Sequence, residues 1–127
     1  MEDSMKPDSD GAAITTAMLH GIPNKLCMEK LISQLNIGYE QLFDYVYIPM
    51  ICNSKCNVGY AFINFKTNEV YKRFAREYDS VEARLKLPGF KSQKVLEVSP
   101  AKWQGCMHNA QQNRCFKGFR AGPRLLL

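Results

Sequence analysis

Apolar residues along the chain follow two periodicities, one typical of helices and one typical of strands. Helical spacing, with an apolar residue every three or four positions, occurs from Met28 to Leu35 and from Val70 to Tyr78. Other segments are β-prone or alternate between apolar and polar residues, and Pro23 and Pro49 end two of them because Pro lacks a ladder N–H. The predicted elements are a strand over 15–22, a helix capped by Asn24 and stopped at Gly38, strands over 43–48 and 58–65, a helix from a Thr67 cap to Tyr78, and a short strand at 96–98.

The order strand, helix, strand, strand, helix, strand predicts an α+β fold of the ferredoxin-like plan. In this plan, a four-stranded antiparallel sheet carries two helices on one face. Residues 79–93 contain Pro88 and Gly89 and are expected to form a long connection with little regular structure. Lys72, Arg73 and Arg76 lie opposite the apolar stripe of the second helix, where we expect a solvated face.

The segment 58–65 carries aromatic residues on both of its faces. At strand period, Ala61 and its alternate neighbours can face a core, whereas Tyr60, Phe62 and Asn64 face the other way. A half-solvated sheet normally places polar residues on its outer face, so two rings there need a reason. Exposed rings can stack on unpaired nucleobases, although an ordinary buried strand can carry the same residues.

This segment also fits the first consensus sequence of the RNA recognition motif (RRM), K/R-G-F/Y-G/A-F-V-x-F/Y, from its second position onward. Val58 stands where that pattern has a basic residue. Alignment of residues 17–22 with the second RRM consensus places Met18 where a ring usually lies, and Met can contact a base through its polarizable sulfur. The predicted RNA-binding platform is therefore Tyr60 and Phe62 with Asn64 on the same strand, flanked by Met18 and Tyr47.

Two segments, Gly-Ile-Pro-Asn-Lys at residues 21–25 and Lys-Cys-Asn-Val-Gly-Tyr-Ala-Phe-Ile-Asn-Phe at 55–65, carry a closer resemblance. They resemble the C-terminal RRM of the Mei2-like RNA-binding proteins, over roughly Thr15 to Arg114. The Val58 and Met18 departures agree with that subfamily. The resemblance implies RNA binding, often to a non-coding RNA, in the control of meiosis or differentiation. Members of the family are usually longer, with further motifs upstream.

The charge of the chain agrees with a polyanionic partner. The net charge is +5, and the first ten residues contain four acids and one base, so the positive charge lies on the remainder. Candidates for phosphate contacts at the rim of the sheet are Lys25, Lys55 and Lys94, although each alone could be a generic surface charge. No apolar run of membrane-spanning length and no signal peptide is evident, and the five cysteines are irregularly spaced. We therefore expect reduced thiols and a nuclear or cytoplasmic location.

The predicted organisation is a disordered leader over 1–12, the RRM over 13–100, an associated helix over 101–114 and a basic tail over 115–127. Trp103, Met107 and Ala110 have helical spacing, and this helix needs a surface on which to bury Trp103. It could lie across the sheet and shield the rings, or pack at the sheet edge and extend the binding surface. Trp103 could equally be a plain core residue.

Other functions receive less support from the residues. A zinc site would need four ligands at familiar spacing, and Cys52, Cys56, Cys106 and His108 do not form two close pairs. Neither His20 nor His108 has an evident catalytic partner, so we expect no enzyme and no cofactor. The main alternative to single-stranded RNA binding is a protein-interaction RRM, whose sheet or helices bind a peptide or a second copy of the domain.

Overall fold

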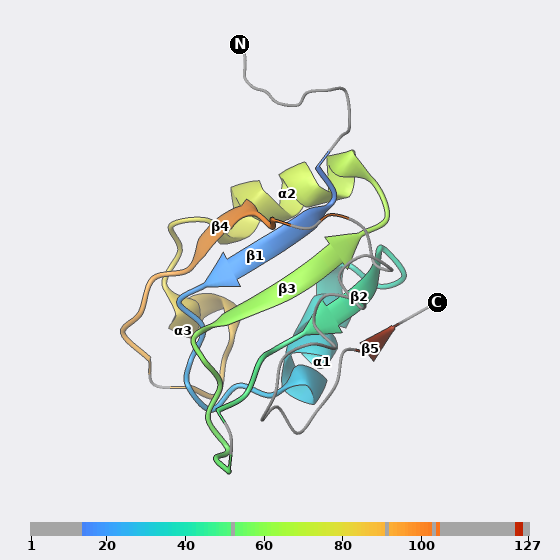
Figure 1. Cartoon of the computed structure of the whole chain (residues 1–127). Coiled ribbons are helices and arrows are strands. Elements are labelled where there is room, and N and C mark those ends of the chain that lie inside the picture. The colour runs from blue at the N-terminus through green and yellow to red at the C-terminus, as the bar shows by residue number, and fades with distance from the viewer. Residues whose placement is uncertain (1–13, 52, 91, 103, 105–123, 126–127) are drawn as a thin grey trace.

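A computed structural model of the chain describes residues 14–51, 53–90, 92–102, 104 and 124–125 (Figure 1). Its elements are the strands β1 (Thr16–His20), β2 (Phe43–Tyr47), β3 (Tyr60–Phe65), β4 (Glu97–Pro100) and β5 (Arg124–Leu125) and the helices α1 (Met28–Gly38), α2 (Asn68–Tyr78) and α3 (Ala83–Lys86). No helix in these residues has the length and apolarity needed to cross a bilayer.

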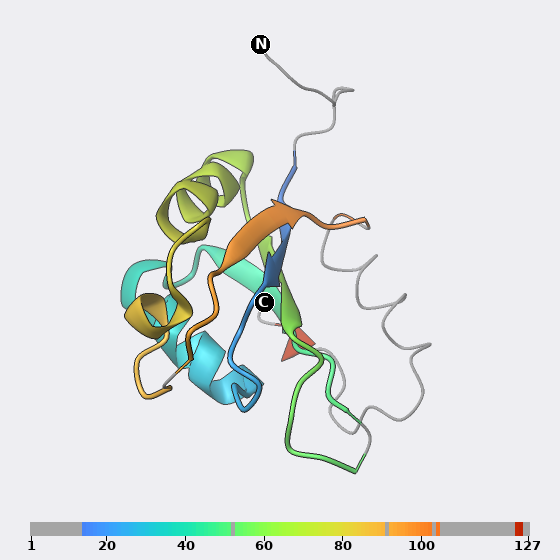
Figure 2. The same ribbon diagram turned by 90° about the vertical axis from the view of Figure 1, so that its left-hand side faces the viewer.

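The strands form one antiparallel sheet in the order β4-β1-β3-β2-β5. Seen edge-on, the three helices lie on one side of this sheet (Figure 2). The predicted ferredoxin-like arrangement is therefore confirmed, with β1 beside β3 at the centre. The fifth strand was not predicted: Arg124–Leu125 pairs with Val46 and Tyr45 at the edge of β2. Also, the connection over 79–93 contains the short helix α3, so the expectation of little regular structure there was wrong.

The hydrophobic core lies between the sheet and the helices. Phe65 of β3 packs on Phe74 of α2, with ring centroids 4.8 Å apart, which shows that this face of β3 is the one the helices cover. Ala61 and Ile63 share that face by strand alternation, and all three β3 residues are buried, as predicted. Leu31 and Leu35 supply the buried stripe of α1, while Phe74 and Tyr78 supply that of α2.

The two main helices begin differently. Thr67 caps α2 as predicted, because its hydroxyl accepts a hydrogen bond from the backbone N–H of Val70 at 3.2 Å. The predicted cap of α1 was wrong, since α1 begins after Cys27 and has no side-chain cap. Asn24 lies in the preceding turn, where its Oδ1 accepts a hydrogen bond from Lys94 Nζ at 2.6 Å.

Asn57 joins the two segments that carry the family resemblance. Its buried side-chain amide donates to the carbonyl oxygens of Pro23 at 2.8 Å and Leu26 at 3.0 Å. Its Oδ1 accepts a hydrogen bond from the backbone N–H of Gly59 at 2.8 Å. The turn before α1 and the entry to β3 are thus held together by one side chain.

Gly21 brings a third segment to the same place. Its φ is +82°, and a Cβ at this position would lie 2.3 Å from the carbonyl oxygen of Val95, so only Gly fits. Its N–H donates to the carbonyl oxygen of Gly59 at 3.0 Å. The end of β1, the start of β3 and the segment before β4 therefore meet at one end of the sheet.

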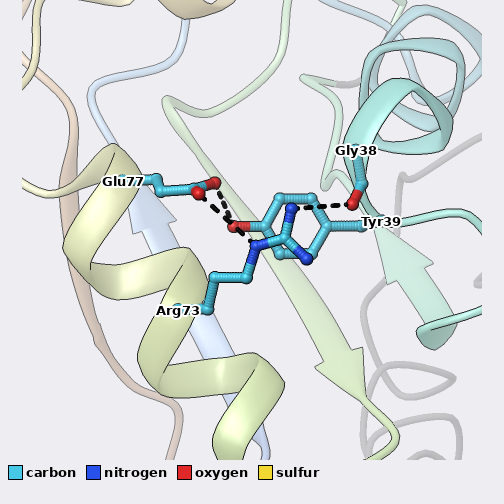
Figure 3. Close-up of polar contacts among 4 residues, drawn as sticks. All are labelled: Gly38, Tyr39, Arg73 and Glu77. Carbon is cyan, nitrogen blue, oxygen red and sulfur yellow. Dashed lines mark hydrogen bonds and ion pairs between the residues drawn. The ribbon is translucent and has the colours of Figure 1, made fainter.

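A polar cluster links the end of α1 to α2 (Figure 3). The Tyr39 hydroxyl donates to Glu77 Oε1 at 2.5 Å, and the Arg73 guanidinium lies 4.4 Å from the centre of the Tyr39 ring while donating to the Gly38 carbonyl oxygen at 3.1 Å. Burial and the bond to Glu77 raise the pKa of Tyr39, and the same bond, with Arg73, lowers the pKa of Glu77. Arg73 therefore has a specific packing role on a helix face expected to be merely solvated.

Candidate functional site

The sheet face opposite the helices carries the residues predicted to form a platform. Residues directly opposite each other on neighbouring strands share a face. Met18 lies opposite Phe62, which lies opposite Tyr47, so these three form one row across β1, β3 and β2. Tyr60 lies in the next row toward the start of β3, and Asn64 in the next row toward its end. The five predicted sheet residues are therefore brought together on the face of the sheet opposite α1, α2 and α3.

Solvent reaches these side chains unequally. Tyr60 and Met18 are partly exposed, whereas Phe62 is only 9% exposed and Tyr47 only 1%. The expectation that both β3 rings stand free is thus corrected for Phe62. Tyr60 packs edge-on against Phe62, with ring centroids 5.6 Å apart and an interplanar angle of 79°, while Met18 and Tyr47 flank Phe62 on the neighbouring strands.

Asn64 is held in a hydrogen-bond network. Its Oδ1 accepts hydrogen bonds from the hydroxyls of Thr15 at 2.9 Å and Thr16 at 2.6 Å, and its Nδ2 donates to Asp44 Oδ1 at 2.7 Å. The Asn64 side chain is buried, with 5% exposure. This amide connects three strands, so it is a fixed support of the platform and not an open donor at its surface.

His20 belongs to the platform and was missed as a site residue. It lies directly opposite Tyr60, with ring centroids 6.1 Å apart and the planes tilted by 47°. Its Nε2 lies 3.5 Å from the Ser99 hydroxyl on β4, and its side chain is half-buried. Strand alternation could have found it, because His20 is two residues from Met18 and so shares its face.

The hydroxyl of Tyr47, one of the platform residues, is uncharged at neutral pH. Burial, followed by the nearby Tyr60 hydroxyl, raises the pKa of Tyr47 to about 12. The phenol of Tyr47 therefore remains protonated across the physiological range. Tyr47 itself is nearly fully buried, so the ring surface open to a base at this end of the sheet is that of Tyr60.

Two of the three predicted rim lysines are near each other. Lys25 and Lys94 line the same hollow beside the turn before α1, and Lys94 Nζ also donates to the Ile22 carbonyl oxygen at 3.2 Å. Lys55 is exposed on the loop between β2 and β3 and does not line that hollow. Two of the three predicted rim charges therefore lie beside the turn that follows β1, at the end of the sheet where His20 lies.

The chain beyond β4 is attached to the start of β1 through Gln104. Its Oε1 accepts hydrogen bonds from the backbone N–H groups of Thr15 and Thr16, and its Nε2 donates to the carbonyl oxygens of Thr16 and Ala101, at distances between 2.7 and 3.1 Å. The predicted helix over 101–114, including Trp103, lies largely outside the described residues, as do the leader and most of the tail.

The zinc alternative also falls mostly outside the described residues, which do not include Cys52, Cys106 or His108. Cys27 and Cys56 are free, partly buried thiols. Within the part of the chain that the structure describes, no three His, Cys, Asp or Glu side chains are grouped closely enough to hold a metal ion.

Comparison with known proteins gives consistent matches over the folded region. The model of the family described as RNA recognition motif 2 matches residues 14–114. Over 72% of this chain, Protein MEI2-like 5 of Oryza sativa subsp. japonica is 35% identical and Meiosis protein mei2 of Schizosaccharomyces pombe is 32% identical. Protein terminal ear1 of Zea mays is 33% identical over 78% of the chain. The chain spans only 11%, 12% and 17% of these three relatives, respectively.

A solved structure shares the fold at low sequence identity. The RRM of Rna15, solved with bound GU RNA, aligns with a TM-score of 0.58 and 16% identity. The match covers 80% of this chain and 97% of that one. At this identity the likeness establishes the arrangement of strands and helices.

Proposed function

The chain belongs to the RNA recognition motif 2 family, in its Mei2-like branch, and from this we propose that it binds single-stranded RNA on the face of its sheet opposite α1, α2 and α3. The observation that carries the proposal is the position of Tyr60. Its partly exposed ring packs edge-on against Phe62, on the face of the sheet opposite α1, α2 and α3. A nucleobase has a flat surface on each side that can stack on such a ring.

The binding mode follows from the unequal exposure of the platform. A base stacks on Tyr60, with His20 beside it, and Phe62 holds the Tyr60 ring from the buried side. Stacking of this kind contributes about 1–3 kcal/mol per base. Phosphates are contacted by Lys25 and Lys94 at the same end of the sheet and by Lys55 on its loop. Phe62 and Tyr47 can contact bases directly only if their neighbours move.

The test is a titration of the full chain with a labelled pool of random single-stranded RNA at several salt concentrations. For single strands, the logarithm of the affinity falls with the logarithm of salt concentration at a slope of about −0.7 per phosphate contact. We expect a clear negative slope and tighter binding to single strands than to duplexes. Binding that is absent across the pool would contradict the proposal.

The cellular role is proposed from the relatives. We propose that the RNA is a non-coding RNA and that binding serves meiosis or differentiation in the nucleus or cytoplasm, in keeping with a relative named Meiosis protein mei2. Crosslinking of the chain to RNA in cells, followed by sequencing of the bound RNA, tests the class of RNA. Imaging of the tagged full-length protein tests the location.

A protein-binding domain is the competing function, and one observation favours it. Ile37 at the end of α1 and Leu85 in α3 are 78% and 63% exposed, and a partner protein could cover either. Single exposed apolar residues are common on proteins that do not use them for binding. RNA binding therefore has the stronger support, and a partner captured without RNA, combined with no RNA affinity, would reverse this preference.

A further inference from the structure

A hollow of about 330 Å³ lies beside the sheet, between the turn before α1 and the segment before β4. Its lining includes the side chains of Asn24, Lys25, Phe90, Ser92 and Lys94, and we call it the Phe90 pocket. Neither Asp nor Glu lines it among the described residues. It thus combines one aromatic ring, hydrogen-bonding groups and positive charge.

The cations of the Phe90 pocket are positioned and are not neutralised by nearby acids. Lys94 Nζ donates to the Ile22 carbonyl oxygen and to Asn24 Oδ1, at 3.2 and 2.6 Å. An ammonium group has three donors, so one remains for a ligand, and both present acceptors are uncharged. Lys25 is exposed on the same rim and forms no ion pair within the described part of the chain. An anionic group at this rim would therefore meet fixed, uncompensated positive charge.

The ring of the pocket is held in place. Phe90 is half-buried, and Lys30 Nζ lies 5.2 Å from the centre of its ring. Phe90 also lines two further hollows, one with Lys30 and Leu87 and one with Glu82 and Arg84, so it separates neighbouring depressions and is not part of the closed core. A nucleotide needs such a pairing of a ring for its base with cations for its phosphate.

Backbone contacts of Gly21 link the segments that carry the pocket to the exposed end of the platform. Gly21 follows β1, donates its N–H to the carbonyl oxygen of Gly59 next to Tyr60, and touches the Val95 backbone next to Lys94. The end of β1, the start of β3 and the segment before β4 thus bring Lys94 toward the row that His20 and Tyr60 form. An RNA strand that leaves Tyr60 in this direction passes over the turn that carries Lys25.

We propose that the Phe90 pocket is a second nucleotide-binding site, which takes a base and phosphate of the same single-stranded RNA whose other bases lie on the sheet. The inference rests on the proposed function and names an additional part of the RNA path. The sheet of an RRM holds two or three bases, so the pocket should matter only for RNA longer than that.

The test compares a short RNA of about three nucleotides with a longer one of about eight, titrated separately against the full chain. Phe90→Leu keeps an apolar side chain but removes the ring. We expect it to weaken binding of the longer RNA by about fivefold or more and to leave the short RNA unchanged. Lys25→Gln should reduce the salt slope for the longer RNA by about 0.7. Lys72→Gln, on an exposed α2 position, is the matched control and should change neither quantity.

Each result separates this inference from the proposed function. If Tyr60→Ala weakens both RNAs while Phe90→Leu and Lys25→Gln change neither, the pocket is not a site and RNA binding by the sheet stands. If Tyr60→Ala changes the affinity for neither RNA, both proposals fail.

Equal loss of affinity for both RNAs in Phe90→Leu would show damage to the domain, and thermal unfolding of this variant measures that damage. Lys25→Gln, at an exposed position, then decides the matter: a loss confined to the longer RNA supports the pocket, whereas an equal loss for both RNAs is the phosphate contact of the sheet alone and overturns the pocket. Polyglutamate can be added as a competitor. If it removes the extra affinity of the longer RNA, the pocket is a general anion or peptide site and the proposal is overturned.

Discussion

The two faces of β3 use the same strand for different purposes. On the helix-covered face, Ala61, Ile63 and Phe65 pack against apolar partners and are fully buried. On the face opposite α1, α2 and α3, Asn64 is hydrogen-bonded and Phe62 contacts the Tyr60 ring, both with low exposure, and Tyr60 remains partly exposed. Low exposure therefore does not distinguish the two faces. What distinguishes them is the kind of neighbour and the gradient of exposure toward Tyr60.

The largest expected effect lies on the helix-covered face. Phe65→Ala should lower the free energy of unfolding by about 3–5 kcal/mol, because it leaves a cavity against Phe74 and Tyr39. Urea unfolding measures this loss. If the variant retains its folded state, its RNA affinity should equal that of the natural chain. A loss below about 1 kcal/mol would mean that this face is not the main core.

A smaller loss of stability is expected from the polar network on the other face. Asn64→Ala removes the hydrogen bond from the buried Thr16 hydroxyl and the one to Asp44, and each such hydrogen bond contributes about 0.5–1.5 kcal/mol. Urea unfolding again gives the value, with Thr16→Val as the matched variant on the partner strand. An Asn64→Ala protein of unchanged stability would contradict the supporting role given to this network.

The gradient of exposure toward Tyr60 predicts that removing this ring weakens RNA binding and has little effect on the free energy of unfolding. Tyr60→Ala should weaken single-stranded RNA binding by about 1–3 kcal/mol, because the partly exposed ring stacks on a base. Tyr60→Phe keeps the ring and serves as the control, with nearly natural affinity. Anisotropy titrations measure both variants. Equal weakening in the two would indicate that the hydroxyl, and not the ring surface, makes the contact.

The smallest effect concerns the pH dependence of the helix layer. The pKa of Glu77 is lowered in the folded state, first by the Tyr39 hydroxyl and then by Arg73 (Figure 3). A lowered folded pKa means that this contribution is present above the ordinary Glu value of about 4.3 and is lost as pH falls through the folded value. In Glu77→Gln, stability should therefore decline less steeply on acidification, as measured by urea unfolding at several pH values. An identical pH profile would exclude the linkage.

The sequence predicted the order of elements and the division of β3 into two faces, because both follow from local periodicity. Burial of Phe62 could not be predicted in this way, since it depends on the register that places Met18 and Tyr47 on its two sides. The cap of α1 was wrong because Asn24 is bonded to Lys94, which is far away in the chain. The tie made by Asn57 likewise becomes visible only when the turn before α1 meets the entry to β3.

Short elements were beyond the reach of periodicity. The helix α3 spans four residues and β5 spans two, which is too little for a repeat to be seen. His20 is a different case, because strand alternation places it on the platform.

The most direct measurement of the central claim is an NMR titration of the isotopically labelled chain with single-stranded RNA, which records every backbone amide at once. If the face opposite α1, α2 and α3 binds RNA, the largest chemical-shift changes will cluster around His20 and Tyr60 on the adjacent strands β1 and β3, and amides in the middle of α1 and α2 will change little. Changes concentrated on the helices, or none at saturating RNA, would contradict it.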